Sequence, residues 1–383
     1  IVTDMKYFDY DAYIKQLEEL VSIDSGSFDP EGIDKVAEAM ARKYEELGLT
    51  VTKKRFDERA GYCLEVRNYP EEESIDILMV GHMDTVFPKG TVAKRPFTMD
   101  EKKAYGPGVD DMKSGLLNMY YVVKELVKEN TKLHLCLALN CDEEISSRYS
   151  NPWISELARH AKCGLVFEPA RKNGAIVSDR KGLARYVIDF KGIYAHAGVN
   201  PQDGASAIHE MAEWITRLVP LNDYEHGTSL NVGIVKGGMG ANTLAENAQC
   251  EVDIRFTNIE ACHKIEAAFE NLRTNPIIKG VTATVTRVGF RPPMASTERS
   301  RSMLEIMRQE GEKCGVDVKW VTTGGGSDGN FMAFEGCSVM DAVGPVGDGA
   351  HGDKEFIWLE TIKPRTEMVY RTLVKLEEKG YFA

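Results

Sequence analysis

Histidine and acidic residues recur in this sequence directly after short apolar runs. His82 and Asp84 follow one such run in LMVGHMDTVF, and Glu143 and Glu144 follow another in ALNCDEEISS. Apolar runs of this length are typical of buried strands, so each pair of side chains is placed where a strand ends. Imidazole and carboxylate groups can bind a metal ion or transfer protons. The pattern therefore favours a hydrolytic metal site.

His82 and Asp84 are separated by one residue, so an extended backbone points both side chains to the same side. A carboxylate in that position can accept the second N–H of the imidazole and strengthen it as a ligand. A buried histidine that is hydrogen-bonded to a neighbouring aspartate for structural reasons alone explains the pair equally well. The pair decides nothing by itself.

Two clusters of acidic residues occur where ordinary surface residues are not expected. Asp110 and Asp111 follow a Gly-Pro-Gly loop in AYGPGVDDMKSG, directly before a segment with helical periodicity. Capping of that helix accounts for one aspartate and leaves the second unexplained. The acids of NCDEE follow the apolar run LHLCLALN. Like charges at a buried strand end repel unless a cation is bound or a proton is retained, which favours a functional role over a solvated acidic run.

The remaining candidates lie further along the chain. Glu168 follows a buried strand in LVFEP, and His351 lies in the glycine-rich segment VGPVGDGAHGDKEF. TTGGGSDGNF contains Gly325, one of three consecutive glycines, and glycines allow a backbone to approach a ligand, although flexible turns explain both glycine-rich segments as well. Together, two histidines, a central aspartate and two glutamates form a ligand set suited to two zinc ions with the aspartate bridging.

Helices and strands alternate in the segments that carry these residues. Helical periodicity covers residues 10–21, 32–47 and 112–129, and apolar strand-like runs cover residues 63–67, 75–80, 133–140 and 164–167. This alternation predicts an α/β domain with a sheet covered on both faces, in which ligands gather at one end of the strands.

The pattern changes near residue 178. Half-buried alternating strands are expected at residues 183–191, 229–236, 248–256 and 281–288, with helices at 205–218 and 259–272. Four strands and two helices predict a two-layer α+β domain inserted into the first domain. The α/β rhythm then resumes with a helix at 301–314, a strand at 316–321 and a helix at 359–379. We therefore predict a discontinuous catalytic domain of residues 1–180 and 293–383, interrupted by a domain of residues 181–292.

Composition limits the classes of protein that fit. A chain of 383 residues exceeds what one hydrophobic core usually fills. Its net charge of -12 argues against a nucleic-acid partner, since such proteins cluster Lys and Arg against phosphates. It contains no apolar stretch near the ~20 residues that span a bilayer, so no membrane partner is expected. The eight cysteines form no CxxC pair, which favours buried reduced thiols and a cytoplasmic location.

Several motifs occur together in the order and spacing of one family of zinc-dependent exopeptidases and deacylases. They are HMDTVFPKGT, AYGPGVDDMKSG, NCDEE, FEP, AHAGVNPQDGA, TGGGSD and the late His351. The family includes glutamate carboxypeptidase, acetylornithine deacetylase, succinyl-diaminopimelate desuccinylase and peptidase T. The chain resembles it along nearly its whole length, and the segment from His82 to Lys113 is most similar to glutamate carboxypeptidase.

The resemblance implies a dizinc centre in which Asp111 bridges the two ions. His82 and Glu168 would complete one metal site, and Glu144 and His351 would complete the other. Cobalt or manganese suits the same ligands.

The resemblance also implies how the ligands are supported. Glu143 would be the general base, and Asp84 would orient His82. The peptide bond between Asp111 and Met112 would be cis, as is typical after the bridging residue of this family.

The inserted domain resembles the lid and dimerisation domain of the family, which implies a homodimer. His196 in YAHAGVNP matches a lid histidine that stabilises the developing oxyanion in the partner's site, although without the family it is an ordinary loop histidine. Asn242 and Arg255 match lid positions that contact substrate. Arg291 matches an arginine of glutamate carboxypeptidase suited to bidentate binding of a carboxylate. The segment TLAENA after Asn242 departs from many relatives, which blurs the prediction of specificity.

We therefore predict a dizinc amide hydrolase that releases a C-terminal amino acid, glutamate or a similar residue, from a small peptide or N-acyl conjugate. The alternative enzyme is an N-acyl amino acid deacylase of the acetylornithine or succinyl-diaminopimelate type, with the same metals and base. A catalytically silent binding protein is disfavoured, because every expected catalytic position is filled.

Overall fold

The computed structural model describes residues 5–383, and the chain divides into two compact units. Unit 1 comprises the described part of Ile1–Asp179 together with Ser296–Thr323 and Ser327–Ala383, and unit 2 comprises Arg180–Ala295 and Gly324–Gly326. The insertion thus runs from residue 180 to residue 295, where the sequence predicted 181 to 292.

An eight-stranded mixed sheet forms the centre of unit 1, with the strand order β1-β2-β6-β3-β7-β16-β8-β15. The strands are β1 (Thr50–Lys54), β2 (Cys63–Arg67), β3 (Ile75–His82), β6 (Leu135–Asn140), β7 (Ala161–Val166), β8 (Ile176–Arg180), β15 (Trp320–Thr323) and β16 (Ser338–Asp341). β6, β3, β7 and β16 run parallel to one another in the middle. All of β6 and nearly all of β3 is buried, which explains why both strands are continuous apolar runs. This mixed α/β fold confirms the predicted class of the catalytic domain.

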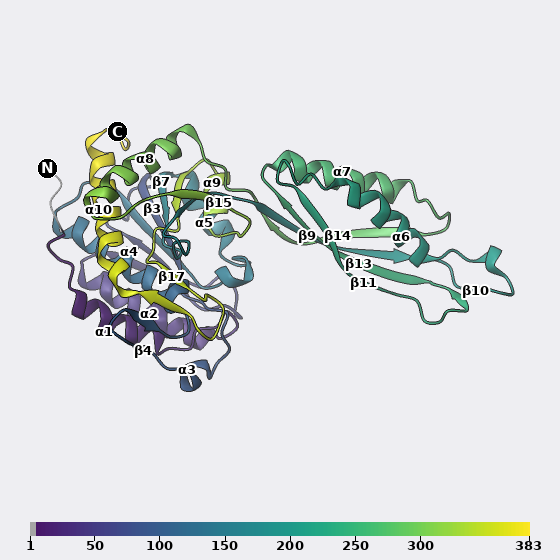
Figure 1. Ribbon diagram of the computed structural model, residues 1–383, viewed down its shortest axis with the longest axis horizontal. Helices are drawn as coiled ribbons and strands as arrows, with labels where there is room; N and C mark the ends of the chain where they lie inside the picture. Colours follow the sequence, from purple (N-terminus) through teal and green to yellow (C-terminus); the bar gives the residue numbers. More distant parts are fainter. Residues whose placement is uncertain (1–4) are drawn as a thin grey trace. The chain divides into compact units, whose positions relative to one another are not determined.

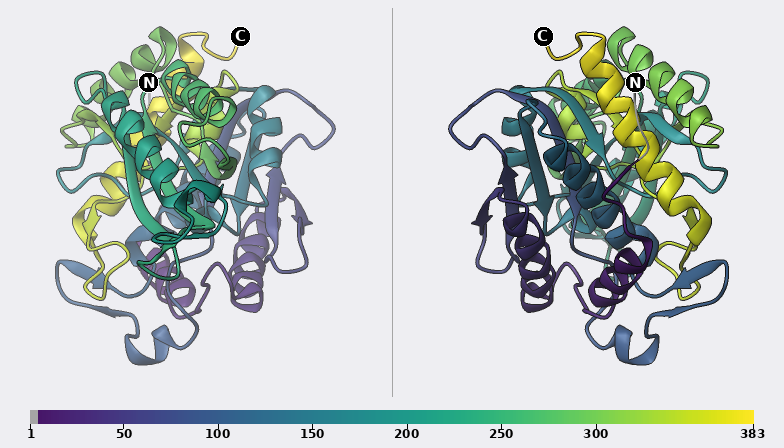
Figure 2. Two further views of the ribbon diagram at one scale, coloured as in Figure 1. Left: turned by 90° about the vertical axis from the view of Figure 1, so that its right-hand side faces the viewer. Right: turned by 90° about the vertical axis from the view of Figure 1, so that its left-hand side faces the viewer.

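Helices cover both faces of this sheet. They are α1 (Tyr10–Val21), α2 (Pro30–Glu46), α4 (Ser114–Lys128), α5 (Asn151–Arg159), α8 (Glu298–Lys313), α9 (Gly329–Phe334) and α10 (Ile362–Glu378), with the short α3 (Thr91–Lys94) outside these layers. Figure 1 shows α4 and α10 on one side of the sheet and α5 and α9 on the other. α10, yellow in the right-hand view of Figure 2, packs against both α4 and α8. Within residues 5–383, no helix is long and apolar enough to cross a membrane.

A second, four-stranded sheet of unit 1 has the order β17-β18-β5-β4. Its strands are β17 (Gly347–Asp348), β18 (Phe356–Trp358), β5 (Lys103–Tyr105) and β4 (Thr98–Met99). Pairing of β18 with β5 brings the loop that carries His351 next to the Gly-Pro-Gly loop before Asp111. Two candidate ligands that lie far apart in the sequence therefore become neighbours.

Unit 2 contains a four-stranded antiparallel sheet of order β11-β13-β9-β14. Its elements are β9 (Gly182–Lys191), α6 (Ala207–Leu218), β11 (Ser229–Gly237), β13 (Asn247–Phe256), α7 (Ile259–Thr274) and β14 (Thr282–Arg291), with the short pair β10 (Ala195–His196) and β12 (Thr243–Leu244). Both helices lie on one face of the sheet (Figure 1). Alternate residues of β9, such as Tyr186 and Phe190, are buried against Trp214 of α6 and Phe269 of α7. This burial of every second residue confirms the alternating strand that the sequence predicted at residues 183–191.

Several element boundaries differ from the prediction for local reasons. The helix expected from Met112 starts at Ser114, because Asp111 and Met112 have non-helical dihedral angles. The strand expected at 316–321 lies further along the chain, at Trp320–Thr323, after a turn in which Gly315 has a φ of 75°. All eight cysteines are free, and all but Cys314 are buried, as expected.

Candidate metal centre

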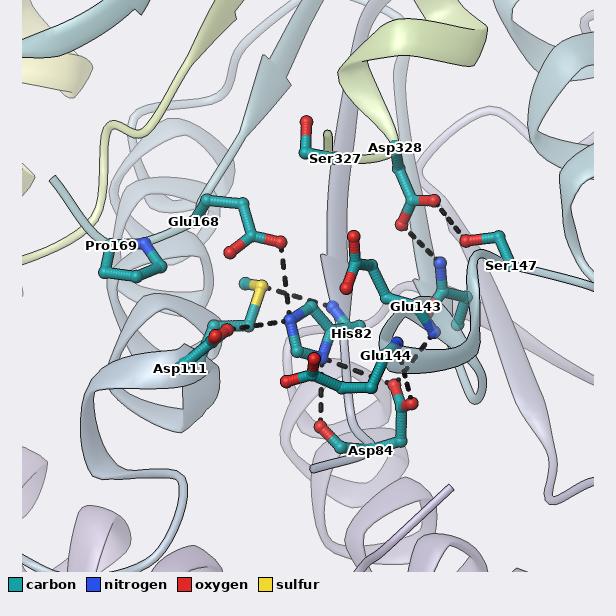
Figure 3. A network of polar contacts seen from close by, with 12 residues as sticks. His82, Asp84, Asp111, Glu143, Glu144, Ser147, Glu168, Pro169, Ser327 and Asp328 are labelled. Carbon is teal, nitrogen blue, oxygen red and sulfur yellow. Dashed lines mark hydrogen bonds and ion pairs between the residues drawn. The ribbon is translucent and has the colours of Figure 1, made fainter. Parts of the chain in front are cut away.

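The candidate metal ligands of unit 1 lie at the carboxyl ends of neighbouring parallel strands. His82 is the last residue of β3, Glu144 follows β6 closely, and Glu168 lies two residues after β7. Since these three strands are parallel and adjacent, their carboxyl ends meet at one edge of the sheet. Figure 3 shows the side chains of Asp111, Glu143 and Glu168 converging near the imidazole of His82.

Asp111 is the centre of this cluster. Its Oδ1 lies 3.0 Å from Nε2 of His82, and its Oδ2 lies 3.1 Å from Nε2 of His351. Glu168 Oε1 is 3.3 Å from the same nitrogen of His82, and Glu144 Oε2 is 3.2 Å from that of His351. Two triads of donor atoms therefore share Asp111, and within each triad all atoms lie within 4.8 Å of one another.

The spacing and chemistry of these donors fit metal ions. Two ligands that each lie 2.0–2.1 Å from a tetrahedral ion are about 3.3 Å apart, which agrees with the 3.2 and 3.3 Å between histidine nitrogen and glutamate oxygen. Glu144 Oε1 is buried and has no hydrogen-bond partner among the described residues, as expected for an oxygen that faces a cation. Imidazole and carboxylate groups suit zinc, cobalt and manganese.

Glu143 lies beside these triads without belonging to either. Its carboxylate forms a third close group with His82 and Glu144, and its side chain is buried. Glu143 begins a short turn that ends at Ile145. A carboxylate in this position can accept a proton from a water molecule held between the triads.

Asp84 supports both His82 and the turn that carries Glu143. Its carboxylate oxygens accept the backbone N–H groups of Glu143 and Glu144, each at 3.1 Å, and the hydroxyl of Ser27 at 2.6 Å. Nδ1 of His82 lies 2.9 Å from the main-chain oxygen of Asp84 and 3.3 Å from its carboxylate. The expected orientation of His82 by Asp84 thus relies mainly on the Asp84 carbonyl, and the carboxylate serves the glutamate turn.

The carboxylates of this cluster lie close together and are largely buried, so they repel one another. Burial, with a further contribution from the charge of Asp111, raises the pKa of Glu144 and of Glu168 to about 8. Hydrogen bonds to Asp111 and Glu144 raise the pKa of His351 to about 11. Without a metal ion the cluster therefore holds protons that a divalent cation would displace.

The metal-free protein is expected to lose stability as the pH rises from about 5 to 8. Over this range Glu144 and Glu168 remain protonated in the folded protein, whereas the same groups ionise near 4.5 in the unfolded chain. The folded state therefore binds more protons, and the free energy of unfolding falls with pH. The raised pKa of His351 acts in the same direction, and the lowered pKa of Asp111 acts only below this range.

Bound zinc replaces these protons, so the rise in Tm that zinc causes is expected to grow by several degrees over the same pH range. Calorimetry with and without zinc at about pH 5.5 and pH 7.5 measures the rise in Tm at each pH. An equal rise at both pH values would contradict the argument.

Comparison with known proteins assigns the chain to a family. Residues 78–375 match the model of peptidase family M20/M25/M40. The chain belongs to this peptidase family. It is 30% identical over 381 residues to carboxypeptidase G2 of Pseudomonas sp. (strain RS-16), an alignment that covers 95% of this chain and 89% of that protein. Membership makes the protein a metallopeptidase-type hydrolase of amide bonds, as the sequence motifs predicted.

The chain is also similar to two further proteins. The chain is 27% identical over 322 residues to succinyl-diaminopimelate desuccinylase of Dechloromonas aromatica (strain RCB), which covers 78% of this chain and 82% of that protein. The solved structure of aminopeptidase PepT from Bacillus cereus ATCC 10987 superimposes with a TM-score of 0.77 at 23% identity and covers 96% of this chain and 99% of that one. That structure supports the fold alone.

Glu355 is a supporting residue that the sequence did not single out. Its buried carboxylate accepts the backbone N–H groups of Gly108, Asp110 and Asp111, each at 2.9 Å. The peptide bond between Asp111 and Met112 is cis, which confirms what the resemblance to the M20 family implied. The only sequence signal for Glu355 is an acid four residues after His351 in AHGDKEF, which becomes meaningful once β18 is paired with β5.

Replacement of Glu355 by glutamine is expected to weaken metal binding by about 10- to 100-fold, as is typical for the loss of a group that orients a ligand. The amide nitrogen would place a donor against at least one of these N–H groups, because the two carboxylate oxygens of Glu355 divide the three bonds between them, so the loop that carries Asp111 would shift. Competition with a chromogenic chelator measures the metal affinity. The exposed Glu360→Gln is the matched control, and unchanged affinity in Glu355→Gln would contradict the assigned role.

Asp328, in the TGGGSD motif, supports the other side of the cluster. Its carboxylate accepts the side-chain amide of Asn140, the last residue of β6, and the hydroxyl of Ser147 (Figure 3). All three residues are buried. They hold both ends of the segment that carries Glu143, which is a role the glycine-rich motif alone did not reveal.

The candidate substrate residues of unit 2 fall into two separate groups. His196 and Asn242 lie together, because β10 pairs with β12 and the N–H of Ala197 donates to the Asn242 carbonyl at 2.9 Å. Arg255 and Arg291 both lie opposite Leu183 of β9, one on each neighbouring strand. Residues directly opposite one another share a face of the sheet, so both arginines lie on the face that α6 and α7 leave open.

The backbone at Gly324–Gly326 lies beside these two arginines within unit 2. Arg255 donates to the Gly324 carbonyl at 3.3 Å and to Asp253 at 2.8 Å, and the Gly325 carbonyl accepts from Arg180 at 3.1 Å. The structure thus groups Gly325 with Arg255 and Arg291. It does not bring Asn242 to them.

Proposed function

We propose that the protein is a dizinc carboxypeptidase that releases glutamate or a similar acidic residue from a small peptide or N-acyl conjugate. The observation that carries the proposal is the pair of donor triads that share Asp111. Arg255 and Arg291 on one face of the unit 2 sheet, beside the Gly325 backbone, suit binding of a carboxylate. The 30% identity with carboxypeptidase G2 supports release of a C-terminal residue.

The proposed roles follow from where each side chain lies. Asp111 would hold both zinc ions, with His82 and Glu168 on one side and Glu144 and His351 on the other. Bound zinc ions would lower the pKa of a shared water molecule and polarise the amide carbonyl.

The proton then moves through protein groups. Glu143 would take the proton of the water and deliver it to the leaving amine, because its carboxylate is the acid of the cluster that belongs to neither triad. Asp84 keeps it in place through the backbone of the turn. His196 would donate a hydrogen bond to the carbonyl oxygen as negative charge develops there.

We also propose that the protein is a homodimer in which His196 serves the active site of the partner copy. His196 and the Arg255 group lie near opposite ends of the ten-residue strand β9, which corresponds to about 30 Å. A small substrate cannot touch both groups of one chain at that distance. β11 is an edge strand with Ile234 and Val235 exposed, so it offers a surface for pairing with a second copy.

Co-expression of His196→Ala with Glu143→Ala is expected to restore activity that neither variant has alone. In a mixed dimer, one active site combines an intact Glu143 from one chain with an intact His196 from the other. Random pairing would yield about a quarter of the wild-type kcat, since half of the dimers are mixed and each has one complete site. Activity no higher than that of the single variants would contradict the exchange.

The alternative function is an N-acyl amino acid deacylase of the acetylornithine or succinyl-diaminopimelate type, and the 27% identity with a desuccinylase favours it. Hydrolysis assays distinguish the two functions. Zinc-loaded protein is given C-terminal glutamate dipeptides, N-acyl-glutamates, acetylornithine and succinyl-diaminopimelate. Glutamate release supports the carboxypeptidase, and turnover of only the latter two compounds assigns the same centre to deacylation. The eight free cysteines support a cytoplasmic location.

A further inference from the structure

A cavity of about 470 Å³ lies in unit 1 directly beside the metal centre. Its wall consists of the loop segments 26–29 and 85–89 together with Glu144 and Ile145. Backbone hydrogen bonds join the two loops: the N–H of Thr85 donates to the Ser25 carbonyl at 2.8 Å, and the N–H of Ser27 donates to the Thr85 carbonyl at 3.1 Å. The cavity is therefore a formed feature, and it shares Glu144 with the candidate ligand set.

Five large apolar residues line this cavity. They are Phe28, Val86, Phe87, Pro88 and Ile145. Phe28 is 79% exposed and Val86 is 42% exposed. Their contact with water forgoes the stabilisation of the folded protein that burial of these apolar side chains would contribute. Apolar side chains left exposed beside a catalytic centre are typical of a ligand pocket of this size.

Apart from Glu144, which faces the candidate metal centre, the charged and hydroxyl groups of the wall already have partners. The Ser27 hydroxyl donates to Asp84, Asp29 accepts the N–H of Gly32 at the start of α2, and Lys89 lies 3.5 Å from Glu31. Carboxylates outnumber cations around the cavity, so an acidic side chain would be repelled there. The cavity suits a neutral apolar group.

We propose that this cavity binds the acyl part of the substrate, and that the enzyme prefers apolar acyl groups of six or more carbon atoms. The proposal rests on the proposed function, in which the Arg255 and Arg291 group binds the carboxylate of the released amino acid. The other half of the substrate then needs a separate site near the reacting carbonyl. The cavity meets that need because Glu144 belongs to both its wall and the candidate metal centre.

The test compares kcat/KM for glutamate release from N-acetyl-, N-hexanoyl- and N-benzoyl-glutamate by the full-length zinc-loaded protein. Hexanoyl and benzoyl conjugates are expected to be favoured over acetyl by about tenfold or more, since each methylene in an apolar pocket contributes to discrimination. Phe28→Ala and Val86→Ser are expected to reduce this preference at least about threefold. Phe334→Ala is the matched control, because Phe334 is a 52% exposed aromatic residue of unit 1 outside the cavity.

A binding measurement gives a second readout that does not depend on turnover. Calorimetry on the Glu143→Ala variant is expected to show about tenfold tighter binding of N-hexanoyl- than of N-acetyl-glutamate, and loss of most of that difference when Phe28→Ala is added.

Three outcomes separate the proposals. Equal kcat/KM for all acyl groups, or a preference that Phe28→Ala and Val86→Ser leave unchanged, overturns the acyl site and leaves the carboxypeptidase in place. Phe28→Ala or Val86→Ser could instead change the preference between released glutamate and released leucine, with no effect on the acyl series. That result would place the released amino acid in the cavity and would also overturn the acyl site. Absence of glutamate release with turnover of another amide overturns the proposed function, and the acyl series built on that amide then tests the cavity.

Discussion

Replacement of Glu143 by alanine is expected to lower kcat for amide hydrolysis by about 10²- to 10⁴-fold. Glu143 is the carboxylate that lies near His82 and Glu144 yet belongs to neither triad centred on Asp111. Its removal therefore leaves both ligand sets complete and takes away the group that moves the proton. Metal content and Tm are expected to stay close to those of the wild type.

Steady-state kinetics, metal analysis and thermal unfolding on the same preparation check this expectation. Glu101→Ala, an exposed glutamate of unit 1, is the matched control. A Glu143→Ala protein with near-normal kcat would remove Glu143 from the mechanism. A protein that has lost metal would instead make Glu143 a ligand.

Replacement of Asp111 by alanine is expected to remove both metal ions and lower kcat/KM by more than about 10³-fold, because the metal supplies several kcal/mol of transition-state stabilisation. The two oxygens of Asp111 each belong to a different triad, one with His82 and one with His351. No other residue of the cluster serves both triads.

Glu168→Ala is the informative comparison, because Glu168 belongs to only one triad. Metal analysis is expected to find two ions per chain in the wild type, about one in Glu168→Ala and fewer still in Asp111→Ala. Two firmly bound ions in Asp111→Ala would show that another group bridges them.

Most elements that position the centre could be predicted from the sequence because their patterns are local. β3 and β6 are buried on both faces, so each appears as an unbroken apolar run that ends at His82 or just before Glu143. In β9 only alternate residues are buried, and the sequence shows the alternation directly. The division of the ligands between two metal sites depended on more than periodicity, since only the family motifs paired His351 with Glu144 and His82 with Glu168.

The features that escaped prediction depend on strand register. Glu355 becomes a support for Asp111 only once β18 pairs with β5, and Asp328 meets Asn140 and Ser147 across a separation of more than 180 residues. The distance between Asn242 and Arg255 is likewise set by the length of β13 between them, although only thirteen residues separate them. The resemblance assigned both residues to substrate contact, and the extended strand places them far apart within unit 2.

The small sheet that carries His351 imposes an order on assembly during protein synthesis. The ligands His82, Asp111, Glu144 and Glu168 all lie within the first half of the chain, whereas His351 and its strands β17 and β18 follow near the end. At ribosomal speeds of about 5–20 residues per second, His351 is translated roughly 10–40 s after Glu168. A nascent chain therefore contains every ligand of the His82 side well before His351 completes the other side. Metal captured on the ribosome would enter that side first, and the second ion would arrive only as the finished chain folds its last strands.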